Sequence, residues 1–185
     1  GYSAFYHCDA LGEVTLPDTV RCVEPKAFSM TAWVNDFLGG SSGEGDFLVE
    51  GGVLVAYRGN TADVRIPEGV RVIAGEAFAN HGEIQSVLFP DSLVVVGEGA
   101  FEGCTSLGEI TFGSNVEEIK DRAFLGNVIG EMALPSSVKK LGIRALGDTV
   151  LSWEGAEPEE TYESSATRLS NGIYRVYPEE GEQDT

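Results

Sequence analysis

The fold is decided by one stretch of sequence, Phe101-Glu-Gly-Cys-Thr-Ser-Leu-Gly-Glu-Ile-Thr-Phe-Gly-Ser-Asn-Val-Glu-Glu-Ile-Lys-Asp-Arg-Ala-Phe124. Its closing Ala-Phe pair recurs at 4–5, 27–28, 77–78 and 100–101, and Ala145-Leu146 continues the series. Successive phenylalanines of this series are 23 residues apart, except that Phe28 and Phe78 are 50 residues apart, or two units plus four residues. The chain therefore contains a 23-residue repeat that is interrupted once.

The apolar residues of one unit follow a spacing that fits neither an amphipathic helix nor an alternating strand. They fall at i, i+3, i+5, i+9 and i+12, namely Leu107, Ile110, Phe112, Val116 and Ile119. Two short β-rich stretches, 109–112 and 116–119, are joined by a tight corner, which holds a proline in four other units. One such unit cannot bury its apolar residues alone, but stacked units can. The pattern therefore predicts a mostly β solenoid whose short strands form two ladders.

The repeated unit, A-F-x-x-C-x-x-L-x-x-I-x-(L/F)-P-x-x-V-x-x-I, resembles the BspA-like leucine-rich repeats of bacterial surface proteins over about residues 4–155. Thr31, His81 and Asn127 depart from it, because they stand where the unit has cysteine. The resemblance implies a right-handed leucine-rich-repeat solenoid with few short helical turns. It also implies an extracellular or cell-surface location, and the recognition of partners rather than chemistry.

An insertion interrupts the repeat at about residues 31–57. Trp33 and Phe37 lie in a predicted short helical turn, and Gly39–Gly45 in a predicted loop. Residues 47–49 and 53–57 predict two strands joined through Glu50-Gly51-Gly52, which is a hairpin signal. Two interpretations stay open: the hairpin substitutes for part of a rung, or the insertion carries a loop that binds a partner.

The repeat pattern ends near residue 155. We therefore assign residues 1–155 to the solenoid and residues 156–185 to an acidic cap and tail. Short β-rich stretches flank Asn171-Gly172, a strong signal for a two-residue hairpin turn. A hairpin here would cover the last rung, whose edge is otherwise open.

Charge and composition disfavour several classes of function. The chain has 185 residues and a formal net charge of −18, whereas a nucleic-acid surface needs a basic footprint. No run approaches the roughly 18 apolar residues of a membrane span, so no membrane insertion is expected. The three cysteines form neither a disulfide framework nor a zinc motif. We expect Cys8 and Cys104 to be buried fillers and Cys22 to face outward.

No catalytic, cofactor-binding or metal-binding residues are predicted. The only histidines are His7 and His81, and no third group has a fixed relation to His7 and Cys8 in the sequence. His81 stands in the cysteine slot of its unit, where we expect it to fill a turn. Gly39–Gly45 is rich in glycine but lacks the lysine of a phosphate-binding loop. These observations disfavour an enzyme.

Residues between the inward positions of each strand are expected to face outward and to offer a binding surface. This places Arg65, Leu88 and Thr111 on the first strands of three successive rungs, and Val94 and Val95 on a second strand. The apolar group Leu88, Val94 and Val95 has three interpretations: contact with a partner, cover by the insertion, or ordinary surface.

These features favour a non-catalytic recognition module, cell-surface or secreted, that binds partners through its solenoid faces. The expected partner is a protein, such as a surface protein of a host or of a neighbouring cell, and no cofactor is expected. The alternative is a structural spacer or stalk within a larger bacterial envelope protein. The sequence leaves the identity of the partner and the oligomeric state open.

Overall fold

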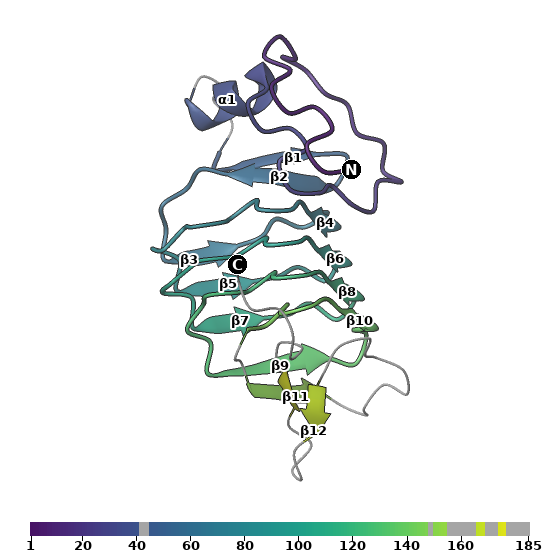
Figure 1. The fold of residues 1–185 in the computed structure, drawn as a ribbon, viewed down its shortest axis with the longest axis vertical. Helices are drawn as coiled ribbons and strands as arrows, with labels where there is room; N and C mark the ends of the chain where they lie inside the picture. The colour runs from purple at the N-terminus through teal and green to yellow at the C-terminus, as the bar shows by residue number, and fades with distance from the viewer. Residues whose placement is uncertain (41–44, 148–149, 155–165, 169–173, 177–185) are drawn as a thin grey trace, which may run out of the picture.

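Figure 1 shows a computed structural model of the chain, which describes residues 1–40, 45–147, 150–154, 166–168 and 174–176. The rungs stack along one axis, so the structure confirms a mostly β solenoid. Three sheets run along the stack, and their strands are listed here in the order in which they pair. The six-stranded sheet comprises β1 (Phe47–Glu50), β2 (Val53–Tyr57), β4 (Val72–Ile73), β6 (Val95–Val96), β8 (Glu118–Ile119) and β10 (Lys140–Leu141). The three-stranded sheet comprises β3 (Asp63–Arg65), β5 (Ser86–Leu88) and β7 (Glu109–Thr111). The four-stranded sheet comprises β12 (Ala166–Arg168), β13 (Tyr174–Val176), β11 (Val150–Glu154) and β9 (Glu131–Pro135).

One helix, α1 (Ala32–Leu38), begins the insertion. Thr31 caps it, since its hydroxyl accepts a hydrogen bond from the backbone N–H of Val34 at 3.3 Å. Trp33 packs edge-on against Phe28, with 5.3 Å between the ring centroids. Within the described residues, no helix is long and apolar enough to cross a membrane.

The Ala-Phe turn repeats the same contacts from rung to rung. The backbone N–H of Phe78 donates to the carbonyl of Ala100 at 2.8 Å, and that of Phe101 donates to the carbonyl of Ala123 at 2.8 Å. The Phe101 ring stacks on Phe78 and Phe124, with centroids 4.6 and 5.4 Å away. Every member of this column from Phe78 to Phe124 is buried. The 23-residue period thus places one ring directly on the next.

The interruption contains the expected hairpin. β1 and β2 pair antiparallel through Gly51 and Gly52, whose φ angles of 54° and 75° fit a tight hairpin turn. β2 then pairs parallel with β4, and the Tyr57 ring lies 4.8 Å from that of Phe78, at the head of the aromatic column. The second strand of the hairpin therefore substitutes for part of a rung.

β2 makes an incomplete rung, and the N-terminal segment fills the gap. Leu54 and Tyr57 are three positions apart, whereas their counterparts Ile73 and Phe78 are five positions apart. The shortened β2 rung offers no acceptor to the backbone N–H of Gly75. This N–H donates instead to the carbonyl of Val23, at 2.8 Å.

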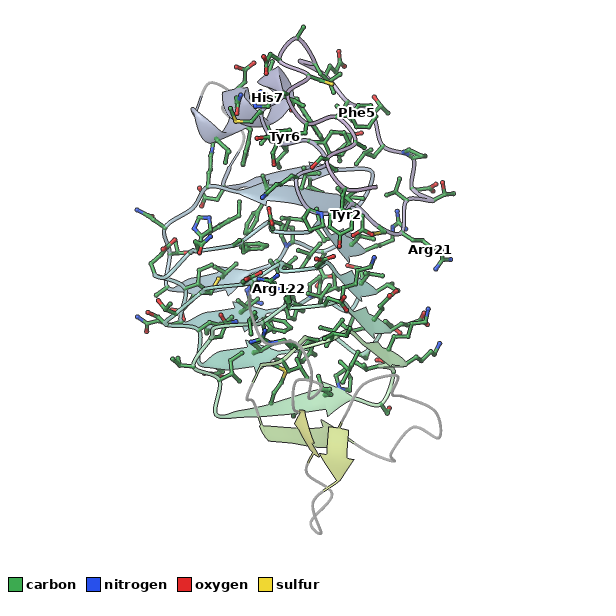
Figure 2. The ribbon with its side chains drawn as sticks, in the orientation of Figure 1. Tyr2, Phe5, Tyr6, His7, Arg21 and Arg122 are labelled. Atoms are coloured by element: carbon green, nitrogen blue, oxygen red, sulfur yellow. The ribbon has the colours of Figure 1, made fainter. Side chains whose placement is uncertain are left out.

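Close backbone approaches hold the N-terminal segment in this place. A Cβ on Gly75 would lie 2.6 Å from the backbone nitrogen of Pro25, and one on Gly51 would lie 2.1 Å from the carbonyl oxygen of Leu16. Tyr2 also donates its hydroxyl to Glu98 (Figure 2 shows Tyr2 well below Phe5 and Tyr6). We call residues 5–28 the first rung, and the stack that begins at β2 the main stack. The first rung therefore docks on the main stack across the hairpin.

The far end of the stack carries a small antiparallel pair. β11 pairs parallel with β9 and antiparallel with β13, and β13 pairs with β12 in the register Ala166↔Val176. This pair covers the edge of β11. The predicted turn at Asn171-Gly172 and the acidic tail lie outside the described residues.

One of the three expectations for the cysteines is wrong. Cys104 is buried and Cys22 is exposed, as expected, but Cys8 is exposed. The slot of Cys104 is enclosed because rungs pack on both sides of it. Cys8 belongs to the first rung, which has a described neighbour on one side only.

We predict that Phe101→Ala lowers the free energy of unfolding by about 3–5 kcal/mol, because it opens a cavity between two stacked rings. Phe5 is 46% exposed and stacks on Phe28 alone in the aromatic column, so Phe5→Ala should cost at most about 1 kcal/mol. Denaturant unfolding of the two variants measures the difference. Equal losses would contradict the proposed stacking.

We also predict that Gly75→Ala loosens the N-terminal segment, because the added methyl group collides with Pro25. Limited trypsin digestion should cut after Arg21 and Lys26 several times faster than in the parent chain. Gly130→Ala is the matched control, since a Cβ there meets nothing within 4 Å. If both variants digest at the parent rate, the N-terminal segment does not depend on this contact.

Candidate functional site

The structure divides the five predicted surface residues between two sheets. Arg65, Leu88 and Thr111 are paired in register along β3, β5 and β7. Val95 lies in β6 of the six-stranded sheet, and Val94 directly precedes that strand. The predicted residues therefore belong to two separate surfaces, which we call the β3–β5–β7 face and the β4–β6 groove.

The β3–β5–β7 face alternates between core and solvent as expected. Val64 and Val87 point into the core, with exposed fractions of 3% and 2%, while Arg65 and Thr111 are exposed and Leu88 is half-buried. A second outward row, Asp63, Ser86 and Glu109, runs beside the first. The face therefore carries a polar row and a mixed row that contains one cation and one leucine.

A hollow of about 420 Å³ opens beside Leu88, at the corners of three rungs. Its apolar lining consists of Ile66, Pro67, Leu88, Phe89, Pro90 and Phe112, and Arg65, Glu68 and Asp91 supply charge. Its far end is held by Asp91, whose carboxylate accepts from the backbone N–H and the hydroxyl of Ser114 at 2.9 and 3.0 Å. These hydrogen bonds lower the pKa of Asp91, so it remains ionised at neutral pH. The hollow is suited to one apolar side chain with a charged group beside it.

The β4–β6 groove corrects the prediction for Val95. Val95 is 5% exposed and Val72, its neighbour in register, is 2% exposed, so neither faces water. Residues 18–21 of the first rung line the groove above them. Because the hairpin occupies the place next to β4, the first rung runs over the outside of β4 and β6 before it reaches Gly75. The expected cover by the insertion is therefore wrong for Val95, because the residues that line the groove above it belong to the first rung.

The aromatic residues of the insertion lie elsewhere. Phe37 is 2% exposed, and the Arg58 guanidinium lies over its ring at 4.5 Å. Arg58 also donates to the carbonyl of Phe37. These contacts hold α1 against the end of β2, away from the residues that line the groove.

The groove itself encloses about 350 Å³ and combines valines with two arginines. Val20 and Val94 are half-buried, and Arg21 and Arg71 come from rungs that are 50 residues apart in the sequence. Arg71 donates to the carbonyl of Gly51 at 2.9 Å, whereas Arg21 projects from the edge of the molecule (Figure 2). No local pattern indicates this groove, because it exists only where the first rung docks.

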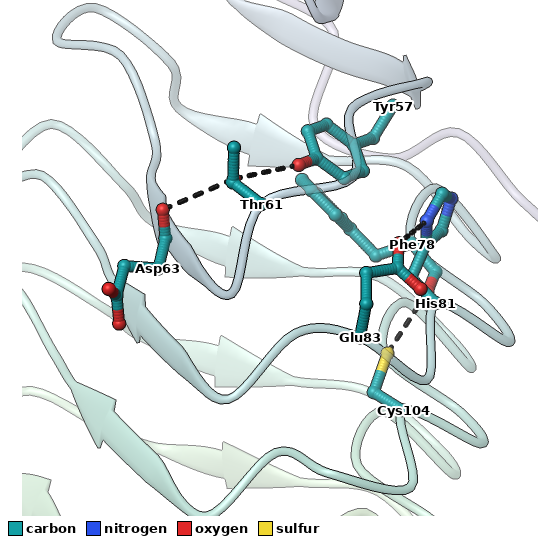
Figure 3. Close-up of polar contacts among 7 residues, drawn as sticks. All are labelled: Tyr57, Thr61, Asp63, Phe78, His81, Glu83 and Cys104. Carbon is teal, nitrogen blue, oxygen red and sulfur yellow. Dashed lines mark hydrogen bonds and ion pairs between the residues drawn. The ribbon is translucent and has the colours of Figure 1, made fainter.

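A histidine, a glutamate and a cysteine meet at the turns of two rungs (Figure 3). His81 Nδ1 lies 2.7 Å from Glu83 Oε1, and its ring packs against Tyr57 at 4.9 Å. The Cys104 thiol, however, donates to the carbonyl of Phe78 at 3.1 Å. Burial raises the pKa of Cys104 to about 11. This arrangement keeps the thiol protonated and does not activate a nucleophile.

A metal site is not indicated either. Across the described ranges, no group of three His, Cys, Asp or Glu side chains is placed to hold a metal ion. His7 approaches Asp9 at 3.5 Å, and both side chains are largely exposed.

The solved structures to which this chain is similar include two leucine-rich repeat proteins. A leucine-rich repeat protein of T. pallidum is 27% identical, with a TM-score of 0.50 over 52% of this chain and 48% of that one. A leucine-rich repeat protein of Bacteroides capillosus is 28% identical, with a TM-score of 0.48 over 56% of this chain and 86% of that one. This chain thus spans about half the length of the T. pallidum protein. Among curated proteins, none matches the chain significantly.

The match to a family model covers most of the stack. The BspA-type leucine-rich repeat region matches residues 1–38 and 56–151, in six copies. The gap between the two matched ranges coincides with the loop and hairpin of the insertion. The chain belongs to the BspA-type leucine-rich repeat family.

Proposed function

We propose that this chain is a non-catalytic recognition module, secreted or held at the cell surface, that binds a protein partner through its β3–β5–β7 face. The observation that carries the proposal is the hollow beside Leu88, next to the aligned row Arg65–Leu88–Thr111. Membership of the BspA-type family supports the location. A surface protein of a host or of a neighbouring cell is the class of partner that we propose.

The shape of this face favours an extended segment of the partner over a broad globular surface. Three strands about 4.8 Å apart span only about 10 Å across the rungs. A stable globular interface buries about 800 Å² on each partner, which is well beyond this row. An extended segment could place an apolar side chain in the hollow and a carboxylate against Arg65, with Thr111 as a further hydrogen-bonding group. Such contacts give weak binding, which several copies of the module would strengthen.

A spacer or stalk is the second candidate function. It is favoured by the linear stack of rungs and by the family's occurrence in longer chains, since this chain spans 48% of the T. pallidum protein. A spacer needs rigidity but no specific side chains on its faces. The two functions therefore make different predictions for substitutions of Arg65 and Leu88. A recognition module should lose affinity for its partner, whereas a spacer should show no effect except on stability.

The test is an affinity measurement on the immobilised chain, after a partner has been captured from surface extracts of host and neighbouring cells. Arg65→Glu with Leu88→Ser should weaken binding of the captured protein by at least about tenfold, because a hot-spot contact is worth more than about 1 kcal/mol. Thermal unfolding should stay unchanged, since neither residue is fully buried.

The matched control is Lys139→Glu, which alters an exposed residue directly before β10 that forms an ion pair with Glu117 at 2.8 Å. It should leave the affinity unchanged. If both variants bind equally well, the β3–β5–β7 face is not the site. If the chain captures nothing, the spacer is the better account.

A further inference from the structure

A cysteine, a lysine and a glutamate meet where the first rung docks on the main stack. Lys120 Nζ lies 2.9 Å from Cys22 Sγ and 2.9 Å from Glu24 Oε1. Cys22 Sγ lies 2.6 Å from the same glutamate oxygen. Lys120 is 98 residues from Cys22 in the sequence, so the contact belongs to the tertiary structure. No other part of the proposed function uses these three side chains.

Lys120 reaches Cys22 because the positions between them carry almost no side chain. Lys120 follows β8, and the equivalent positions after β6 and β4 are Gly97 and Ala74. The backbone also requires glycine at 97, since a Cβ there would lie 2.5 Å from the carbonyl oxygen of Ile73. The lysine side chain can therefore extend along this column until Nζ meets Cys22 and Glu24 of the first rung.

We propose that Cys22 and Lys120 form an oxidation-dependent covalent crosslink, Sγ–O–Nζ, which ties the first rung to the main stack. Cys22 is exposed, so a peroxide can reach its sulfur. The other two thiols lack this arrangement. Cys104 is buried against a carbonyl, and Cys8 makes no side-chain hydrogen bond to any described residue.

The chemistry balances with two molecules of hydrogen peroxide. The first oxidises the thiol to a sulfenic acid, which forms the S–O bond and releases one water. The second removes the sulfenic hydroxyl hydrogen and one hydrogen from the amine while the N–O bond forms, and it leaves as two waters. The product differs from the reduced chain by one added oxygen and two lost hydrogens.

Glu24 is a positioning residue in this site. Burial tends to raise the pKa of Glu24, but the hydrogen bonds from Cys22 and Lys120 outweigh it and lower the pKa. The carboxylate therefore stays ionised and holds Cys22 and Lys120 at one oxygen. Desolvation tends to lower the pKa of Lys120, but the same hydrogen bonds outweigh it and raise this pKa, so the ammonium group must give a proton to the solvent before the N–O bond forms. Partial desolvation and the hydrogen bond to Glu24 raise the pKa of Cys22, which lowers the fraction of thiolate that a peroxide can oxidise.

The experiment treats the purified full chain with hydrogen peroxide and analyses it by intact mass and tryptic mapping. We expect a species with one more oxygen and two fewer hydrogens, which a thiol reductant converts back. Trypsin should yield peptide 22–26 joined to peptide 72–122, because a modified Lys120 is no longer cleaved. Oxidation should also slow tryptic cleavage after Arg21, in a manner reversed by the reductant.

Two variants separate the crosslink from ordinary oxidation. Lys120→Arg keeps the positive charge but removes the amine, so the joined peptides should vanish while Cys22 is oxidised to sulfenic or sulfinic acid. Lys139→Arg is the matched control and should crosslink like the parent chain.

The proposal is overturned if the parent chain, with its native fold confirmed by circular dichroism, gives only sulfinic acid at Cys22. It is equally overturned if Cys22 pairs with Cys8 of another molecule, or if the extra mass maps to Lys26. Because the parent chain alone decides these outcomes, a misfolded variant does not leave the proposal untested.

Discussion

Everything in this structure depends on the contact between one Ala-Phe turn and the next. In the uninterrupted part of the stack, the turns at Phe78 and Phe101 each donate a backbone N–H to the alanine carbonyl of the next rung and place a phenylalanine ring on the next one. Residues two before and two after the ring adopt left-handed backbone angles, as at Glu76 and Asn80 with φ of 60° and 64°. These conditions recur together only if the same residue types return every 23 positions. The period is therefore a geometric requirement of the turn, and the strands follow from it.

The main departure from that period creates the most distinctive surfaces. Because β2 runs from Leu54 to Tyr57 in fewer residues than a full rung, it leaves the N–H of Gly75 without a partner in the hairpin. The first rung supplies the carbonyl of Val23 instead and must run outside β4 to do so. One missing pair of residues thus accounts for the docked first rung, the burial of Val95 and the β4–β6 groove.

Local pattern was sufficient for the parts of the fold that repeat. The spacing of the Ala-Phe pairs predicted the stack, and Gly51-Gly52 predicted the hairpin, because both signals act over a few residues. The row Arg65–Leu88–Thr111 followed from strand alternation alone. Val95 and Cys8 could not be predicted in the same way, since their burial depends on which segment lies beside their rung. The hollow beside Leu88 was missed because corner prolines were interpreted only as chain-bending residues, although they also wall a cavity.

The groove and the Cys22–Lys120 contact are two consequences of one docking event. One wall of the groove is residues 18–21, and its floor belongs to β4 and β6. Cys22 and Glu24 follow that wall directly and are held by Lys120, which belongs to the main stack. In a solenoid, each rung is stabilised mainly by its neighbours, so a terminal rung separates more easily than a central one. A covalent bond from Cys22 to Lys120 would therefore act where the stack is weakest, and it would keep the wall of the groove at a constant distance from its floor. The width of this groove therefore depends on how firmly the first rung is held.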